Sequence, residues 1–117
     1  MKQNSLQMTL LFDHYGELLS EKQNTFFDLY YNQDLSLAEI AEEAGISRQG
    51  VHDALAKAEA ALLTFEEKLG CVAKEFQLQQ CLDVITAAAE ERKDLPQAVR
   101  ILEAVQALRS TEWHLKD

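Results

Sequence analysis

The chain has 117 residues, a mass of 13.3 kDa and a formal net charge of −9, with 20 acidic against 11 basic side chains. This length allows one compact domain, or a small domain with a helical extension, but not two ordinary domains. The acidic balance repels polyanions at long range, so nucleic acid is not a favoured partner of the surface as a whole. One proline and four glycines leave few places where a long helix must stop, and we therefore expect an all-α protein.

The two cysteines indicate a reducing environment. Cys71 and Cys81 fall within one predicted helix, where their spacing corresponds to about 15 Å along the axis, beyond the reach of a disulfide. We expect both to be small buried hydrophobic residues. No stretch reads as a signal peptide or approaches the roughly 20 apolar residues of a membrane span. A cytoplasmic protein with no membrane partner is therefore expected.

Apolar residues recur at three- and four-residue steps over the first part of the chain and predict a helix over 5–19. They are Met8, Leu11, Phe12, Tyr15 and Leu19. Ser20 and Gln23 have the spacing of a capping box and predict that a second helix begins at residue 21. The turn-forming residues 32–34 end this helix.

The next two helix starts are also marked. Ser36 and Glu39 form a capping box, and Leu35 can pack on Ile40 as a hydrophobic staple. Gly45 has the place of a left-handed residue after a helix, so this helix is short, about 37–43.

Ser47 is the next N-cap, with Ile46 and Val51 spaced as a second staple. Nothing breaks the following helix before Gly70, so it covers about 48–69. Its apolar stripe is longer than three short helices can cover and consists of Val51, Leu55, Ala58, Leu62, Phe65 and Leu69.

Two further helices follow. One carries an apolar stripe over 72–89, and the last begins near Pro96, where Asp94 and Gln97 have the spacing of a capping box. Apolar residues cover more than one face of the last helix, so we expect a homodimer formed through the C-terminal half. The predicted organisation is a helix-turn-helix domain over 1–70 and C-terminal helices over 71–117 that pack on it and dimerise.

Residues 36–55, SLAEIAEEAGISRQGVHDAL, have the pattern of a helix-turn-helix unit. Ala41 is small, so the second helix can approach the first. Gly45 turns the chain, and Ile46 with Val51 closes the core between the helices. This pattern is specific for the supersecondary unit and less specific for DNA binding, because a fold does not determine a function.

The segment from Leu18 to Leu55 resembles the promoter-binding fourth region of bacterial sigma factors. Together with LLFDHYGELLSEKQ before it and FEEKL after it, the first 70 residues or so resemble the small YlxM family of Gram-positive bacteria. The resemblance implies an all-helical protein that is related to the sigma-factor module and binds DNA. It also implies a link to the signal recognition particle pathway, because the family's gene lies beside that of the particle's GTPase.

By position, the resemblance implies that Arg48, Gln49, His52 and Asp53 read bases. Ser47 and the free N–H groups of the helix start would bind a phosphate, and Lys57 would contact the DNA backbone. Two interpretations of Arg48 remain open, because it can equally pair with Glu43 or Glu59. Gly50 lies early in the predicted second helix and lowers its stability by about 0.5–1 kcal/mol relative to alanine. The close approach of another backbone would explain a glycine at this position.

The charge of the motif favours a second function. Between Ser36 and Glu59 two cations, Arg48 and Lys57, face five acids, which gives −3, whereas DNA binders commonly neutralise about 6 to 10 phosphates. An acidic adaptor that uses the fold to bind a basic protein, without binding DNA, is therefore the alternative. Weak, salt-sensitive binding of double-stranded DNA is the prediction for the first function.

Catalysis has no support in the sequence, which has no phosphate-binding glycine loop, nucleophile elbow or HExxH motif. We expect no enzyme, no cofactor and no metal site, since His14 and His114 lack companion ligands. Trp113 is interpreted as a cap of the C-terminal helices or as an interface anchor.

Overall fold

The computed structural model describes residue 2 and residues 4–111, and this part of the chain contains α-helices and no strand. The all-α class predicted from the sequence is confirmed. The chain divides into two compact units, Met1–Gly70 and Cys71–Asp117. Each unit is described by itself below.

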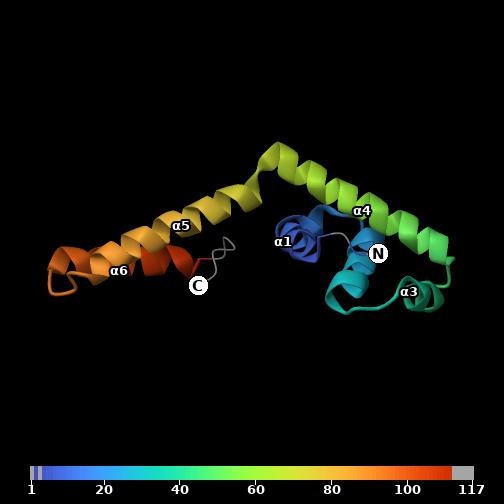
Figure 1. Cartoon of the computed structure of the whole chain (residues 1–117), viewed down its shortest axis with the longest axis horizontal. Helices are drawn as coiled ribbons and strands as arrows, with labels where there is room; N and C mark the ends of the chain where they lie inside the picture. Colours follow the sequence, from blue (N-terminus) through green and yellow to red (C-terminus); the bar gives the residue numbers. More distant parts are fainter. Residues whose placement is uncertain (1, 3, 112–117) are drawn as a thin grey trace. The chain divides into compact units, whose positions relative to one another are not determined.

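The first unit is a helical bundle built around one long helix. Its elements are α1 (Ser5–Tyr15), the 3-10 helix η1 (Gly16–Leu18), α2 (Glu21–Phe27), the π-helix η2 (Asp28–Asn32), α3 (Leu37–Ala44) and α4 (Arg48–Leu69). Helix α4 packs against α1, α2 and α3, which lie along one side of it in Figure 1. The three shorter helices therefore share α4 as their common support.

Helix α1 ends at Tyr15, earlier than the predicted helix over 5–19, and the chain continues as the 3-10 helix η1. Ser20 then caps α2 as expected. Its hydroxyl accepts the N–H of Gln23 at 3.1 Å, and the Gln23 side chain accepts the N–H of Ser20 at 3.1 Å. The predicted start of α2 is confirmed to the residue.

The second half of the predicted helix over 21–32 is a π-helix. The N–H of Gln33 bonds to the carbonyl of Asp28 at 3.1 Å, five residues back rather than four. The wider turn places the adjacent Tyr30 and Tyr31 both in the core. Asp34 then takes a left-handed conformation, φ 58°, and ends the segment.

Stacked aromatic rings form one part of the core. The ring of Phe27 stacks on Phe12 at 4.5 Å and on Tyr31 at 4.3 Å, measured between ring centroids. Such stacking adds about 0.5–1.5 kcal/mol per pair beyond the area buried. The largest side chains that are almost completely buried are Phe27, Met8, Leu11, Ile40, Leu62 and Val51.

Two tyrosine–glutamate hydrogen bonds attach α4 to the N-terminal helices. The hydroxyl of Tyr31 donates to Oε2 of the buried Glu59, and that of Tyr15 donates to Oε1 of Glu66 at 2.6 Å. Glu59 and Glu66 are two turns apart, so both bonds lie on the same side of α4. The apolar stripe of α4 is buried as far as Leu62, while Leu69 is 48% exposed.

The second unit is an antiparallel hairpin of α5 (Cys71–Glu90) and α6 (Pro96–Arg109), which run side by side in Figure 1. Proline begins α6 as predicted, but the predicted capping box of Asp94 and Gln97 is wrong. Leu95 is the N-cap and has no side-chain bond to the helix. Asp94 instead accepts two bonds from Arg92 at 3.0 and 2.9 Å, and this guanidinium holds the pKa of Asp94 below its usual value.

Two further predictions concern the C-terminal half. Cys71 and Cys81 are both exposed, so their predicted burial is wrong, because the hairpin is only two helices thick. Trp113 and His114 lie outside the described residues.

In the described part of the chain, no helix combines the length and apolarity needed to cross a membrane.

Candidate nucleic-acid interface

Helix α3, the turn at Gly45 and the start of α4 form the predicted helix-turn-helix unit. Ser36 caps α3 reciprocally, since its hydroxyl accepts the N–H of Glu39 at 3.1 Å and its own N–H donates to the Glu39 carboxylate at 2.9 Å. The backbone N–H of Ser36, with a smaller contribution from its side chain, holds the pKa of Glu39 below its usual value. Glu39 is therefore ionised at neutral pH.

The turn between the two helices depends on Gly45. This residue takes a left-handed conformation with φ 72°, and its N–H bonds to the carbonyl of Ala41 at 2.9 Å. Glycine adopts this conformation at low cost, whereas other residues disfavour it by about 1–2 kcal/mol. Ile40, Ala41 and Val51 are buried where the two helices meet, so the turn fixes the direction in which α4 starts.

Ser47 caps α4 as predicted. Its hydroxyl oxygen accepts the N–H of Gly50 at 2.9 Å, and the proton of this hydroxyl can still be donated to a phosphate. A Cβ at Gly50 would lie 3.1 Å from the Ser47 oxygen and 3.5 Å from the Ile46 side chain. The cap therefore crowds a side chain at this position, and the nearest atoms of the described chain belong to side chains and not to a backbone.

The first turns of α4 expose a row of polar side chains. All six residues that sequence reasoning selected are exposed, and they are Ser47, Arg48, Gln49, His52, Asp53 and Lys57. Arg48, Gln49 and His52 also line a shallow hollow together with Leu37 at the start of α3. Leu37 was not predicted, because its position in α3 gives no sign that it lies beside the start of α4.

The residues of this row interact with one another. Gln49 donates to Oδ1 of Asp53 at 2.9 Å, one helical turn away, and His52 lies 3.6 Å from the same oxygen. The Gln49 amide keeps its carbonyl oxygen and a second N–H for other partners. The ion pairs found among the described residues do not include Arg48, so its predicted pairing with Glu43 or Glu59 is not formed.

Glu59 does not lie on the acidic surface of the motif. Its carboxyl group faces the core and accepts the bond of Tyr31, a direction indicated by its position four residues after Leu55 on the buried stripe of α4. The exposed acids of the motif are Glu39, Glu42, Glu43 and Asp53. Two cations thus share this surface with four acids, which still predicts weak attraction to DNA.

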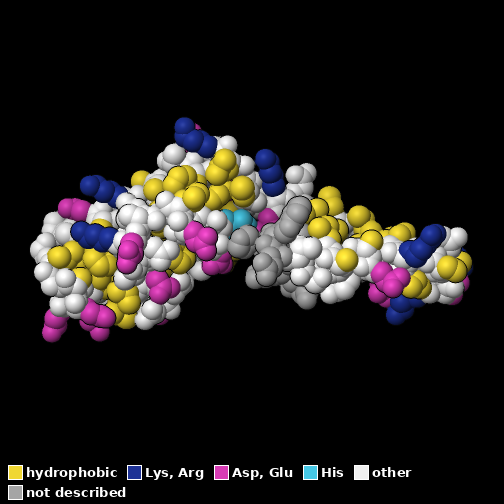
Figure 2. Space-filling model, turned by 180° about the vertical axis from the view of Figure 1, so that it is seen from behind, with side chains coloured by type: hydrophobic (Ala, Val, Ile, Leu, Met, Phe, Trp, Pro, Cys, Tyr) yellow, Lys and Arg dark blue, Asp and Glu magenta, His cyan; other side chains and the backbone are white. Residues whose placement is uncertain are grey.

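Figure 2 shows acidic and basic side chains mixed over the face of the first unit that it presents. Within the described residues there is no group of three or more His, Cys, Asp or Glu side chains that could hold a metal ion. The geometry that remains is an exposed polar helix start on a rigid, capped support.

This fold and this exposed helix start define a helix-turn-helix protein. The family model described as "Putative helix-turn-helix protein, YlxM / p13 like" matches residues 2–102. The chain belongs to this family, UPF0122, as the sequence resemblance predicted.

Three relatives within the family are similar over nearly their whole length. A UPF0122 protein of Thermoanaerobacter sp. (strain X514) is 45% identical over 108 residues, which cover 90% of this chain and 92% of the relative. One from Symbiobacterium thermophilum is 45% identical over 101 residues, covering 86% and 94%. One from Halalkalibacterium halodurans is 39% identical over 108 residues, covering 92% and 99%.

Proposed function

We propose that this protein is a cytoplasmic regulatory protein that reads double-stranded DNA with the first turns of α4. The observation that carries the proposal is the exposed row that starts with Ser47, Arg48 and Gln49 at the capped end of the second helix of a helix-turn-helix unit. In such units the N-terminal residues of the second helix contact base edges in the major groove.

Each side chain of the row has a defined task in this proposal. Arg48 donates to guanine or to a phosphate, and Gln49 pairs with adenine after releasing Asp53. The hydroxyl of Ser47 and the free N–H groups of the first turn hold a phosphate, since a helix start attracts anions. Lys57, exposed two turns further on, contacts the DNA backbone.

Weak binding by one chain favours a homodimer. A single α4 brings only Arg48 and Lys57 to the DNA, whereas helix-turn-helix dimers bind two half-sites about one helical turn apart. Two copies on one DNA molecule add their contacts through the high local concentration of the second site. We therefore propose that the protein binds DNA as a dimer.

The proposal is tested by fluorescence anisotropy with the duplex sequences that the wild-type chain selects from a random pool. We expect Arg48→Ala with Gln49→Ala to weaken binding about tenfold or more, because each good base contact contributes about 1–3 kcal/mol. Gln80→Ala with Arg100→Ala is the matched control, since these residues are exposed on the second unit. Equal binding by the two double variants, both folded, would exclude the assigned residues.

A second candidate function is that of an acidic adaptor in the signal recognition particle pathway. The exposed Glu39, Glu42 and Glu43 on α3 favour it, because together they form an acidic surface suited to a basic protein. The family resemblance suggests a component of the particle, or its RNA-bound complex, as the partner. The same anisotropy measurement with the particle's GTPase and RNA in place of the duplex tests this candidate.

A further inference from the structure

The hairpin of α5 and α6 has too small a core to be complete. Its buried hydrophobic residues in the described part of the chain are Leu82, Ala89, Ala98 and Val105. Two of these are alanines, and short helices depend mainly on tertiary packing for their stability. A unit with so few buried side chains needs additional packing.

A second apolar stripe lies beside the buried one on each helix. On α5, Leu78 and Ile85 are seven residues apart, as are Cys81 and Ala88. Together with Leu82 and Ala89 they give each heptad three neighbouring core positions, the pattern of a helix in a bundle. Helix α6 repeats the pattern. We call the seven residues of the additional stripes the hairpin apolar face: Leu78, Cys81, Ile85, Ala88, Ile101, Ala104 and Leu108.

Six of the seven residues of this apolar face are exposed, and Leu108 is half-buried. Ile85 and Ile101 are 43% and 44% exposed, close to each other in value. The small Cys81, Ala88 and Ala104 alternate with the larger side chains, which allows another helix to approach closely and interdigitate. Figure 2 shows hydrophobic side chains along the hairpin and charged side chains gathered at the end with its connecting loop.

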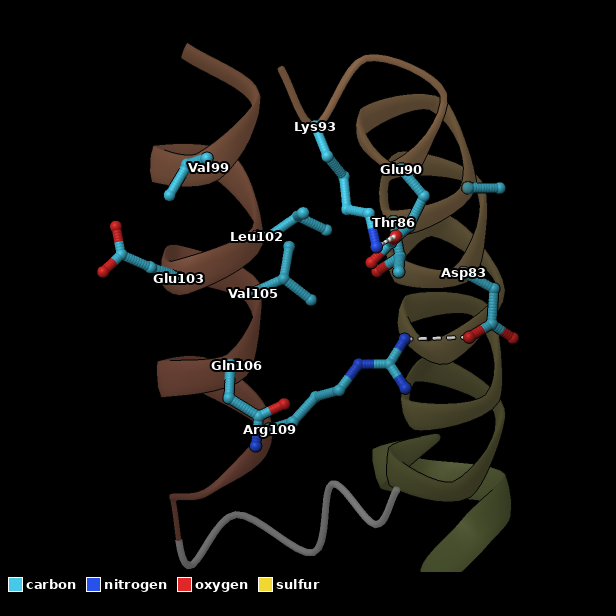
Figure 3. Close-up of a pocket in the computed structure, with 11 residues that line it drawn as sticks. Asp83, Thr86, Glu90, Lys93, Val99, Leu102, Glu103, Val105, Gln106 and Arg109 are labelled. Carbon is cyan, nitrogen blue, oxygen red and sulfur yellow. Dashed lines mark hydrogen bonds and ion pairs between the residues drawn. The ribbon is translucent and has the colours of Figure 1, made fainter. Parts of the chain in front are cut away.

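The opposite side of the hairpin carries charge. Figure 3 shows a groove where Arg109 of α6 reaches to Asp83 of α5 at 2.8 Å and Lys93 pairs with Glu90 at 3.1 Å. Glu103 also lines this groove. From the helical spacing, Asp83, Glu90 and Glu103 all point away from the hairpin apolar face.

We propose that the hairpin apolar face binds the same face of a second copy of this chain, so that two hairpins form a four-helix bundle. A chain with a net charge of −9 repels its own copy, so a stable contact between copies must bury a surface without acids. The hairpin apolar face has none, and an isologous contact there brings no like charges together. Bundle formation would also supply the packing that each hairpin lacks.

The bundle gives the proposed DNA reader its second α4, and to that extent the inference rests on the proposed function. The two ideas differ in their response to salt. Salt screens the repulsion between two acidic chains and should strengthen the dimer, whereas it weakens contacts to phosphates. A failure of DNA binding therefore leaves the mass of the dimer unaffected, so sedimentation tests the bundle independently of the proposed function.

Sedimentation of the full chain at micromolar concentration tests the proposal. We expect a species of about twice 13.3 kDa, and a tenfold or greater weakening of the dimer in Ile85→Glu. Val99→Glu is the matched control, because Val99 is also 43% exposed but lines the groove. A monomeric wild-type chain at low and near-physiological salt, or dissociation by Val99→Glu but not by Ile85→Glu, would overturn the proposal.

The thiol of Cys81 provides a second measurement that needs no change to the face. In a Cys71→Ser chain, we expect Cys81 to react with a thiol reagent at least tenfold more slowly than a cysteine placed at Phe76, which is 65% exposed and lies on the other side of α5 by helical spacing. Since this chain keeps every apolar side chain of the face, the result holds even where Ile85→Glu unfolds the hairpin. Equal reaction rates at the two positions would show that the face is open to solvent.

Discussion

Tyr31 of η2 donates its hydroxyl hydrogen to Oε2 of Glu59 in the middle of α4. This bond satisfies a buried carboxyl group and joins the π-helix to the helix that starts at Ser47. The π-helix η2 and the buried Glu59 therefore act together to hold the middle of α4 in place, while the first turns of α4 remain exposed.

Removal of the Tyr31 hydroxyl should destabilise the first unit. Tyr31→Phe leaves the Glu59 carboxyl group buried without its donor, and we expect the free energy of unfolding in urea to fall by about 1–3 kcal/mol. Tyr15→Phe should cost less, because its acceptor Glu66 is only half-buried. If the free energy of unfolding fell no more in Tyr31→Phe than in Tyr15→Phe, the importance assigned to the Tyr31–Glu59 hydrogen bond would be wrong.

Gly16 should not tolerate a side chain. A Cβ there would lie 3.0–3.3 Å from ring atoms of Phe12, and this ring is held against Phe27. Although alanine favours a helical backbone, we expect Gly16→Ala to destabilise the protein by about 1–3 kcal/mol through overpacking. Thermal unfolding of Gly16→Ala with and without Phe12→Leu checks the cause, since the smaller side chain should remove most of the penalty.

Lys57 should contribute to the salt dependence of DNA binding. Lys57→Ala is expected to weaken binding to all duplexes alike and to reduce the slope of log K against log salt by about 1. Lys68→Ala is the control, because Lys68 is exposed in the last turn of the same helix, far from the exposed row. Titrations at several salt concentrations measure both slopes, and equal slopes for the two variants would exclude the backbone contact.

Charge reversal on α3 separates the two candidate functions. The triple change of Glu39, Glu42 and Glu43 to lysine should strengthen DNA binding by adding positive charge beside α4, and should weaken contact with a basic protein partner. Binding of the variant to duplex DNA and to the particle's GTPase with its RNA is measured in parallel. Changes of the same sign in both assays would contradict the division between a DNA surface and an acidic surface.

Because of the capping box of α3, the stability of the folded chain should decrease as the pH becomes acidic. The pKa of Glu39 in the folded chain is lowered below its ordinary value, chiefly by the backbone N–H of Ser36. Its contribution to stability is therefore present above the ordinary carboxyl pKa and is lost as pH falls through the folded value. We expect the difference in melting temperature between wild type and Glu39→Ala to be largest near neutral pH and to shrink in acid. A difference that is constant with pH would show that ionisation has no part in the cap.

Local signals predicted much of the first unit. The caps at Ser20, Ser36 and Ser47 and the left-handed Gly45 were predicted correctly because each depends on residues within one helical turn. The absence of a helix breaker before Gly70 also predicted the course of α4 from residue 48 to 69.

Features that depend on distant contacts could not be predicted in the same way. The π-turn at 28–32 follows from packing two adjacent tyrosines against α4, which no local pattern encodes. Asp94 looked like a cap, but Arg92 competes for its carboxylate. The candidate residues on α4 were implied by the family resemblance, whereas the place of Leu37 beside Arg48 required the crossing of two helices.

Anisotropy of labelled duplex DNA with the wild-type chain and with Arg48→Ala/Gln49→Ala, at low and near-physiological salt, tests the central proposal most directly. The account predicts binding at low salt that falls steeply as salt rises and is weakened about tenfold or more by the double change. The absence of wild-type binding at low salt, or undiminished binding by the folded double variant, would contradict it.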